Sequence, residues 1–280
     1  MVTMEENKEF AQAAVDKLVE RGVSASWRVV EKNNGTEMVG VTLNIGDVCP
    51  TIYVDNTESM DELNEFVDRC MEIADMGAPE IDMDKILTKK YAKANLKARL
   101  ANRYANRSAI NNEIERNSLI VREVFGDLVM YAVLEVEVNG NGTIKVSKGI
   151  AEKLGMSKDE ILDIALANSN AEATEDNEAL PFPLPFKVIT NTGRVGGAVS
   201  ILNEEFIAGL GEDFWMIPSS VHEVLLLEPN DEMDPEYMTE MIREVNASQL
   251  RPEEVLSDHP YRIKNGKVVL GGYDPAVALA

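Results

Sequence analysis

Four neighbouring residues near the C-terminal end carry side chains that could act together in hydrolysis. They are Ser219, Ser220, His222 and Glu223, which place two hydroxyls, an imidazole and a carboxylate within one short run. A serine nucleophile needs a histidine base in hydrogen-bond contact and a third group that orients the base. Arg243, in a downstream helical segment, could line a pocket beside them. These residues are the candidates for a hydrolase-like enzyme.

The local pattern favours a structural role for the same residues. Pro218, Ser219 and Ser220 read as a turn between two strands, where serine hydroxyls commonly satisfy backbone groups. On the following strand His222 and Glu223 would point to opposite faces, which opposes a compact triad. No G-x-S-x-G sequence is present. We therefore expect a non-catalytic turn. Arg243 and Asn246 would dock against this turn in a structural role.

Metal and cofactor sites are not predicted. His222 and His259 are the only histidines, and Glu223, Glu254 and Asp258 could supplement them. Neither H-E-x-x-H nor C-x-x-C occurs, and two distant histidines are a weak signal for zinc. No Walker-type phosphate loop is present, and the glycine-rich run at 193–197 lies between predicted strands, which favours a hairpin loop.

Charge is distributed unevenly along the chain. The formal net charge is −22, which keeps a protein soluble and repels nucleic acid on average. The segment from Lys85 to Arg122 holds ten basic and two acidic residues, so it carries +8 and the remainder −30. An acidic exterior of this kind can imitate the phosphate backbone and occupy a nucleic-acid-binding site.

The basic segment has two interpretations. Lysines recur every four residues from Lys85 to Lys97, as on one stripe of a helix. The first interpretation is a helix neutralised by acidic residues of the same fold. The second is an exposed strip that binds an anion, an acidic partner or nucleic acid, with Tyr91 and Tyr104 stacking on bases. The candidate binding residues are Lys89, Lys93, Lys97, Arg99 and Arg103.

The alternation of helical and strand patterns predicts an α+β protein of two α/β units with mainly antiparallel hairpins and flanking helices. The first unit spans residues 1–80 in the order α-β-β-β-α and opens with a capping box at Thr3 and Glu6. A basic helical connector follows at 81–126. The second unit spans 127–280.

Within the second unit the sequence predicts several further features. An acidic, proline-ended linker is expected at 169–185, and a strand at 196–202. Asn265-Gly266 predicts a type I′ hairpin turn. In the helix that begins at Asp234-Pro235, the residues expected to face inward are Met238, Met241, Ile242 and Val245.

The contexts of the two cysteines and the hydropathy of the chain predict the cellular compartment. Cys49 and Cys70 lie in apolar contexts, which predicts buried thiols rather than a disulfide framework. No signal-peptide pattern opens the chain, and no apolar run approaches the roughly 20 residues of a membrane span. We expect a cytoplasmic protein that does not contact a membrane.

Four segments resemble an uncharacterised domain family of clostridial and gut-bacterial proteins, often found in mobile elements. These segments are VITNTGRVGGAVSIL, WMIPSSVHEVLLL, MIREVNASQ and PEEVLSDHPY. The resemblance is strongest from Asp127 onward and weakest in the basic segment. It implies a fold of paired α/β units and a bacterial or phage setting, and it brings no known activity.

Together these observations predict a non-catalytic, cytoplasmic binding protein whose partner is another protein. A specific form of the hypothesis is an acidic inhibitor of a nucleic-acid-binding host factor. The alternatives are the hydrolase-like enzyme at the Ser219–His222 turn, and nucleic-acid binding through 85–107.

Overall fold

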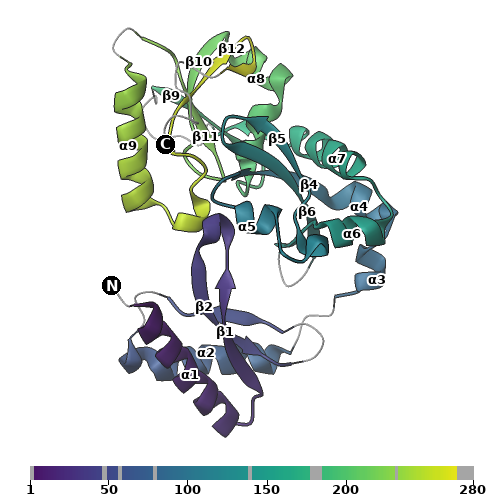
Figure 1. Ribbon diagram of the computed structural model, residues 1–280, viewed down its shortest axis with the longest axis vertical. Coiled ribbons are helices and arrows are strands. Elements are labelled where there is room, and N and C mark those ends of the chain that lie inside the picture. Colours follow the sequence, from purple (N-terminus) through teal and green to yellow (C-terminus); the bar gives the residue numbers. More distant parts are fainter. Residues whose placement is uncertain are drawn as a thin grey trace. The chain divides into compact units, whose positions relative to one another are not determined.

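The computed structural model describes residues 3–45, 49–55, 59–77, 81–137, 141–176, 185–230 and 233–269. The chain forms two compact units, which we call unit 1, built on Met1–Asp82, and unit 2, built on Met83–Glu137 and Asn141–Ala280. Both combine helices with antiparallel sheets (Figure 1). The predicted α+β class is confirmed.

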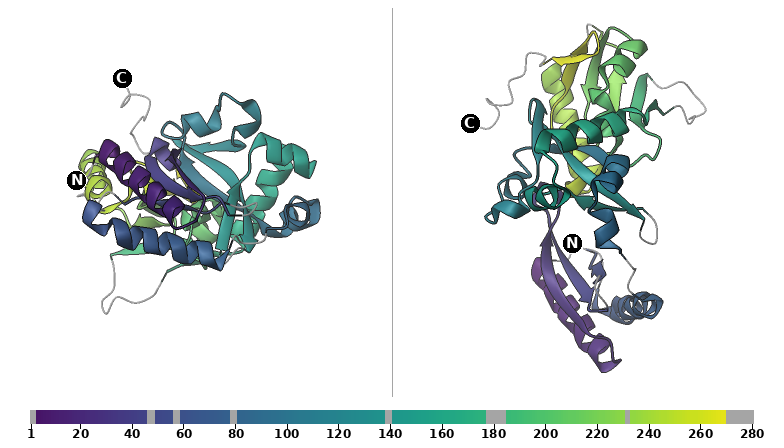
Figure 2. Two further views of the ribbon diagram at one scale, coloured as in Figure 1. Left: turned by 90° about the horizontal axis from the view of Figure 1, so that it is seen from below. Right: turned by 90° about the vertical axis from the view of Figure 1, so that its right-hand side faces the viewer.

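Unit 1 is a three-stranded sheet with two long helices. Its elements are α1 (Met4–Glu20), β1 (Ala25–Glu31), the 3-10 turn η1 (Asn33–Gly35), β2 (Glu37–Leu43), β3 (Thr51–Tyr53), η2 (Met60–Glu62) and α2 (Leu63–Met76). Strand β2 lies between β1 and β3, and both pairings are antiparallel. Helix α1 packs against β1, β2 and α2, and the two helices lie side by side (Figure 2).

The core of unit 1 is formed where the helices meet the sheet. Phe10 of α1 and Phe66 of α2 make an edge-to-face contact with ring centroids 5.3 Å apart, and both are buried. The predicted capping box is confirmed, because Thr3 and Glu6 each accept a hydrogen bond from the other's backbone N–H. Cys70 is buried in this core as expected, whereas Cys49 is exposed.

The first sheet of unit 2 is organised around the ten-residue strand β6. The elements of this part are α3 (Met83–Ile86), α4 (Lys89–Asn95), β4 (Leu96–Asn102), α5 (Arg107–Ile110), η3 (Glu115–Asn117), β5 (Val121–Phe125), β6 (Leu128–Glu137), β7 (Asn141–Lys145), α6 (Lys148–Leu154) and α7 (Lys158–Asn170). Strand β4 pairs along one edge of β6, and β5 and β7 pair in succession along the other.

The helix predicted through Lys97 is wrong beyond Asn95. Helix α4 ends there and β4 begins at Leu96. Leu96, Ala98 and Leu100 alternate with Lys97 and Arg99, and all five are buried. This alternation suits a strand covered on both faces. The lysine period of four crosses a helix–strand boundary by coincidence.

The second sheet of unit 2 has six antiparallel strands in the order β13-β12-β10-β11-β9-β8. The elements are β8 (Ala173–Glu175), β9 (Phe186–Asn191), η4 (Gly197–Leu202), α8 (Glu204–Leu210), β10 (Asp213–Ile217), β11 (Val224–Leu227), α9 (Pro235–Gln249), η5 (Pro252–Glu254), β12 (Tyr261–Lys264) and β13 (Lys267–Val269). The 3-10 turn η4 contacts β9 of this sheet and β4 of the other, so it lies where the two sheets meet.

Three expectations for this sheet need correction. The strand predicted at 196–202 is the buried 3-10 turn η4. Part of the predicted linker is ordered, since α7 continues to Asn170 and β8 pairs with β9; residues 177–184 lie outside the described residues. Met241 and Val245 face outward, at 45% and 46% exposed.

The predicted turn between β12 and β13 is confirmed. Asn265 and Gly266 both have positive φ, at 51° and 74°, as a type I′ turn requires.

Candidate functional site

The Ser219–Glu223 turn connects β10 to β11 and uses its polar groups to close itself. The Ser220 backbone N–H donates to the Glu223 carbonyl at 3.1 Å, and the His222 N–H donates to the Ser220 hydroxyl at 3.0 Å. The Ser219 hydroxyl donates to the Glu223 carboxylate at 3.4 Å. Both hydroxyls are therefore engaged in holding the turn, as sequence reasoning anticipated.

His222 is held by a neighbouring loop, residues 191–197, and by Thr190 of β9 just before that loop. Its Nδ1 accepts a hydrogen bond from the Gly196 N–H at 3.0 Å, and its carbonyl accepts one from the Thr190 hydroxyl at 2.8 Å. The neutral ring therefore carries its proton on Nε2, which lies 3.7 Å from the Glu254 carboxylate. In the part of the chain that the structure describes, no hydrogen bond links this ring to the hydroxyl of Ser219 or Ser220.

The 191–197 loop fits closely around its contacts. The Asn191 side-chain amide both accepts from the Val195 N–H and donates to the Val195 carbonyl, each at 3.1 Å. A Cβ on Gly197 would lie 2.5 Å from the Asn191 backbone nitrogen and 2.7 Å from the His222 carbonyl oxygen. A Cβ on Gly196 would lie 2.1 Å from the side chain of Arg99. Only glycine fits at these two positions.

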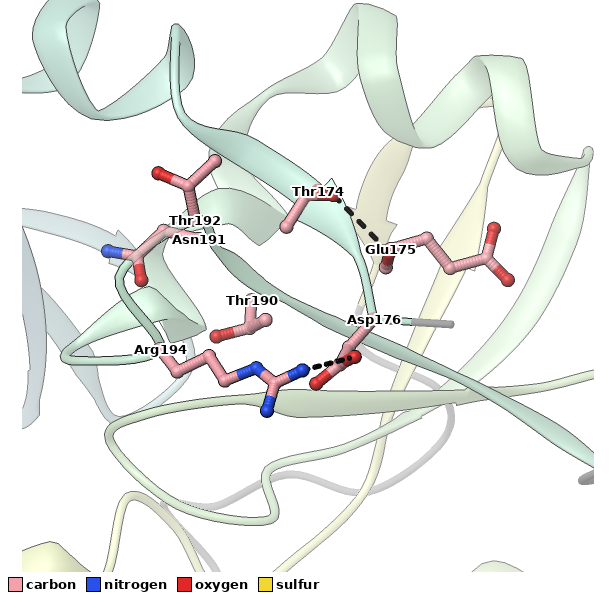
Figure 3. A pocket seen from close by; sticks show the side chains of 7 residues that line it. All are labelled: Thr174, Glu175, Asp176, Thr190, Asn191, Thr192 and Arg194. Carbon is pink, nitrogen blue, oxygen red and sulfur yellow. Dashed lines mark hydrogen bonds and ion pairs between the residues drawn. The ribbon is translucent and has the colours of Figure 1, made fainter. Parts of the chain in front are cut away.

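An open polar pocket lies on the same loop and the adjoining strands β8 and β9 (Figure 3). Its lining residues are Thr174, Glu175, Asp176, Thr190, Asn191, Thr192 and Arg194. The Arg194 guanidinium donates to the Asp176 carboxylate at 3.0 Å. Thr190 donates its hydroxyl to His222, and the amide of Asn191 is bonded to Val195. The pocket offers hydrogen-bonding groups without a histidine base or a serine nucleophile among its lining residues.

A buried polar cluster of unit 2 is centred on Asp127, in the turn between β5 and β6. Its carboxylate, 6% exposed, accepts hydrogen bonds from Asn102 Nδ2 at 2.6 Å and from the Ser257 hydroxyl at 3.0 Å. The Tyr261 hydroxyl also donates to it, and His259 Nε2 lies 3.4 Å away. This cluster joins the β5–β6 turn to the segment that leads into β12.

The surroundings of Asp127 set its protonation and that of Tyr261. Burial alone would raise the pKa of the Asp127 carboxyl, but the neighbouring His259 imidazole and the hydrogen bonds from Tyr261 and Ser257 together outweigh burial and lower this pKa below its usual value. Burial and the Asp127 charge raise the pKa of Tyr261. The carboxylate is therefore charged and the phenol protonated at neutral pH, which matches their roles as acceptor and donor.

Sequence reasoning missed this cluster as a unit. It considered His259 only as a possible metal ligand together with His222, and Asp258 only as a residue that could supplement them. The segment SDHPY supplies Ser257, His259 and Tyr261, but nothing local indicates that Asp127 is their partner. In the described part of the chain no group of three or more metal-ligand residues is gathered.

The helix was predicted to dock against the Ser219–His222 turn, but α9 bonds to Ser257 and Asp258 through Asn246. Asn246 of α9 is buried and donates to the Ser257 carbonyl at 3.0 Å and to Asp258 Oδ1 at 2.8 Å. Arg243, one turn before Asn246, is exposed. The helix thus anchors the SDHPY segment, and the structure assigns His222 and His259 to different sets of partners.

The five basic binding candidates do not form one exposed strip. Lys89 and Lys93 are exposed on α4, where Lys93 lies 3.7 Å from Glu160. Lys97 is buried and paired with Glu172.

Arg99 lies on strand β4, and Arg103 is the first residue after that strand. Arg99 is buried, with Glu135 at 3.6 Å, and burial lowers the pKa of its guanidinium. Arg103 pairs with Glu123 at 2.5 Å. These contacts agree with the interpretation that acidic residues of the same fold neutralise the segment.

Across the described residues, every helix is too short or too polar to serve as a membrane span.

The antiparallel sheets with flanking helices define an α+β protein. Comparison with protein families then gives one match, a "Family of unknown function (DUF5688)", over residues 4–180 and 169–264. The chain belongs to this family. Neither a curated protein nor a solved structure matches the chain.

Proposed function

We propose that this chain is a non-catalytic binding protein that acts on another protein through its acidic exterior. The observation that carries the proposal is the bonding of the candidate catalytic residues. Ser219, Ser220 and His222 direct their polar atoms to the turn and to the 191–197 loop. Groups used in this way are supports for the backbone rather than a nucleophile and its base.

Charge supports the same proposal. Of the five basic residues that might have bound nucleic acid, Lys97 and Arg99 are buried and ion-paired inside unit 2, so they do not join Lys89 and Lys93 in one exposed strip. The protein keeps a formal net charge of −22, because internal ion pairs do not alter the total. A surface of this sign attracts basic sites and steers their approach.

The finer form of the proposal names a partner class and a setting. The partner is a nucleic-acid-binding protein whose basic site the acidic chain occupies. The setting is the cytoplasm of a bacterium or of a cell that carries its mobile elements. The support is the net charge and the family resemblance of the C-terminal motifs.

The test is capture from a nuclease-treated bacterial lysate on the immobilised chain at 0.05 M NaCl, followed by elution with 0.5 M NaCl. We expect nucleic-acid-binding proteins that elute with salt, because screening weakens contacts between exposed charges. The purified chain should then displace DNA from the captured protein. Partners that are absent, or that remain bound at high salt, would contradict the proposal.

A second experiment separates binding from catalysis. The variant Ser219→Ala/Ser220→Ala/His222→Gln should keep its partner binding, because those side chains support the turn. If this variant keeps its unfolding temperature and its partner binding but loses the biological activity of the chain, that result would favour the hydrolase-like enzyme instead.

A further inference from the structure

Helix α9 carries apolar side chains on its outer face. Tyr237, Met241 and Val245 are 65%, 45% and 46% exposed, and their spacing of four residues places them in one row. Figure 1 shows α9 on the flank of unit 2. Monomeric proteins commonly expose single apolar residues, whereas a contiguous row marks a contact surface.

This row is not needed to hold the helix in place. The inner face of α9 is formed by Met238 and Ile242, each 4% exposed, and by Asn246 with its hydrogen bonds to Ser257 and Asp258. A surface helix usually needs one apolar face to pack on its own domain. Helix α9 has that face and, beside it, a second row of apolar side chains that are exposed.

An acidic row runs directly beside the apolar row. Glu236, Glu240 and Glu244 each precede one of the outward apolar residues and are exposed. They also repeat every four residues, so the two rows follow the helix together. Arg243 is the basic residue of this outer surface, on the side of the acidic row away from Tyr237. The face thus combines apolar contact area with a net negative charge.

We propose that the outer face of α9 is a docking surface for a basic amphipathic helix of another protein. Such a helix would set a row of apolar side chains on Tyr237, Met241 and Val245, and a row of Lys or Arg side chains against the glutamates. Helix-in-groove and helix-pair recognition use anchors at this spacing. The inference rests on the proposed function, since it names where the binding protein makes contact and what it contacts.

Charge selects this occupant over a second copy of the chain. Two α9 helices in contact would bring two acidic rows and two chains of formal charge −22 together. Like charges facing each other across an interface are unfavourable. A basic partner turns the same row into an attraction.

The probe is a synthetic 20-residue helical peptide with leucine every four residues and a lysine beside each leucine. Binding to the full-length chain is measured by fluorescence anisotropy at 0.05 and 0.3 M NaCl. Two comparison peptides share one property each with the probe: one is oligolysine of equal charge, and one replaces every lysine by glutamine. We expect the probe to bind more tightly than either, because both rows contribute.

Two triple variants of α9 separate the contributions. Tyr237→Ser/Met241→Ser/Val245→Ser should weaken probe binding about tenfold or more, given the apolar area removed. Glu236→Gln/Glu240→Gln/Glu244→Gln should weaken binding and flatten its salt dependence. All six side chains are exposed, so the unfolding temperature and circular dichroism should stay close to the wild type.

Matched controls lie on α2, in unit 1. Glu65→Gln/Glu72→Gln/Asp75→Asn removes the same charge from exposed positions, and Met76→Ser removes an apolar side chain that is 76% exposed. These controls should leave probe binding within about twofold of the wild type.

Three results would overturn the proposal. The first is equal weakening by the α2 and α9 charge variants, which would mean a non-specific charge effect. The second is unchanged binding in both α9 variants. The third is a dimer in sedimentation that the apolar variant dissociates, which would make a second copy the occupant. If lysate partners are still captured by the α9 variants, the docking site is wrong while the binding function stands.

Discussion

Asp127 shows how one side chain can hold two distant segments together. Asn102, Ser257 and Tyr261 all donate to its carboxylate, and His259 lies beside it. A buried charge with this many donors is favourable, whereas a donor left without its acceptor is costly. The free energy of unfolding therefore depends on the ionisation of the Asp127 carboxyl group.

The first prediction concerns this carboxylate. Asp127→Asn should lower the free energy of unfolding by about 2–4 kcal/mol at pH 7. The folded-state pKa of Asp127 lies below its usual value, so the contribution is fully present above the unfolded pKa of about 3.9 and is lost as the pH falls through the folded pKa. The difference between wild type and variant should therefore shrink below about pH 4.

Urea denaturation followed by circular dichroism at pH 7, 5 and 3 measures this difference. Glu65→Gln, at an exposed position, is the control and should stay near the wild type throughout. A difference for Asp127→Asn that stays constant down to pH 3 would contradict the assignment.

The residues of the Ser219–His222 turn could be interpreted from sequence, because turn chemistry is local. Serines near a proline commonly bond to nearby groups of the turn: the Ser220 hydroxyl accepts from the His222 backbone N–H, and the Ser219 hydroxyl donates to the Glu223 carboxylate. Asp127 could not be found in this way. Its partners Ser257 and Tyr261 lie 130 and 134 residues away in the chain, and no periodicity reports such a contact.

At the scale of elements, the 191–197 loop and η4 depend on close backbone approach. Gly197 lies where the loop meets β9 and the His222 turn, with backbone atoms at 2.5 and 2.7 Å from the position of a Cβ. Backbone contacts cannot move aside as a flexible side chain can, so any added methyl group forces a shift of the loop.

The second prediction compares two glycines. Gly197→Ala should lower the free energy of unfolding by about 2–3 kcal/mol through overpacking. Gly209, inside helix α8, has open space at its Cβ position and no positive φ. Gly209→Ala should therefore raise stability by about 0.5–1 kcal/mol, because alanine favours a helix. Thermal unfolding of both variants checks the pair, and equal effects would contradict the packing argument.

Helix starts were predictable because capping is a local signal, and Thr3 and Asp234 both cap as expected. The change from helix α4 to strand β4 could not be predicted from such a local signal. Lys97 and Arg99 suggest an exposed helix by residue type, but tertiary packing buries both and pairs them with Glu172 and Glu135. Long-range pairing with β6 decides the conformation there.

At the scale of the whole molecule, the chain forms two units with separate cores. The core of unit 1 contains only residues of that unit, from Phe10 to Cys70. Units of this kind can unfold in separate steps.

The third prediction uses Phe66, which is fully buried in unit 1. Phe66→Ala should cost unit 1 about 3–5 kcal/mol and lower the temperature of one calorimetric transition while the other stays in place. The matched change in unit 2 is Phe214→Ala, at 2% exposed, which should move the other transition. A single transition that shifts as a whole in both variants would contradict independent unfolding.

The joining of Asp127 to residues 257–261 also bears on how the chain folds while it is synthesised. Strand β10 pairs with β11 early but receives β12 only after Tyr261 has been made. On the ribosome, unit 1 can form its core as soon as α2 emerges, whereas unit 2 must wait until residues 257–264 have emerged. Until then its half-built sheet exposes an unpaired edge and apolar surface, which is the period when chaperones or proteases would act on it.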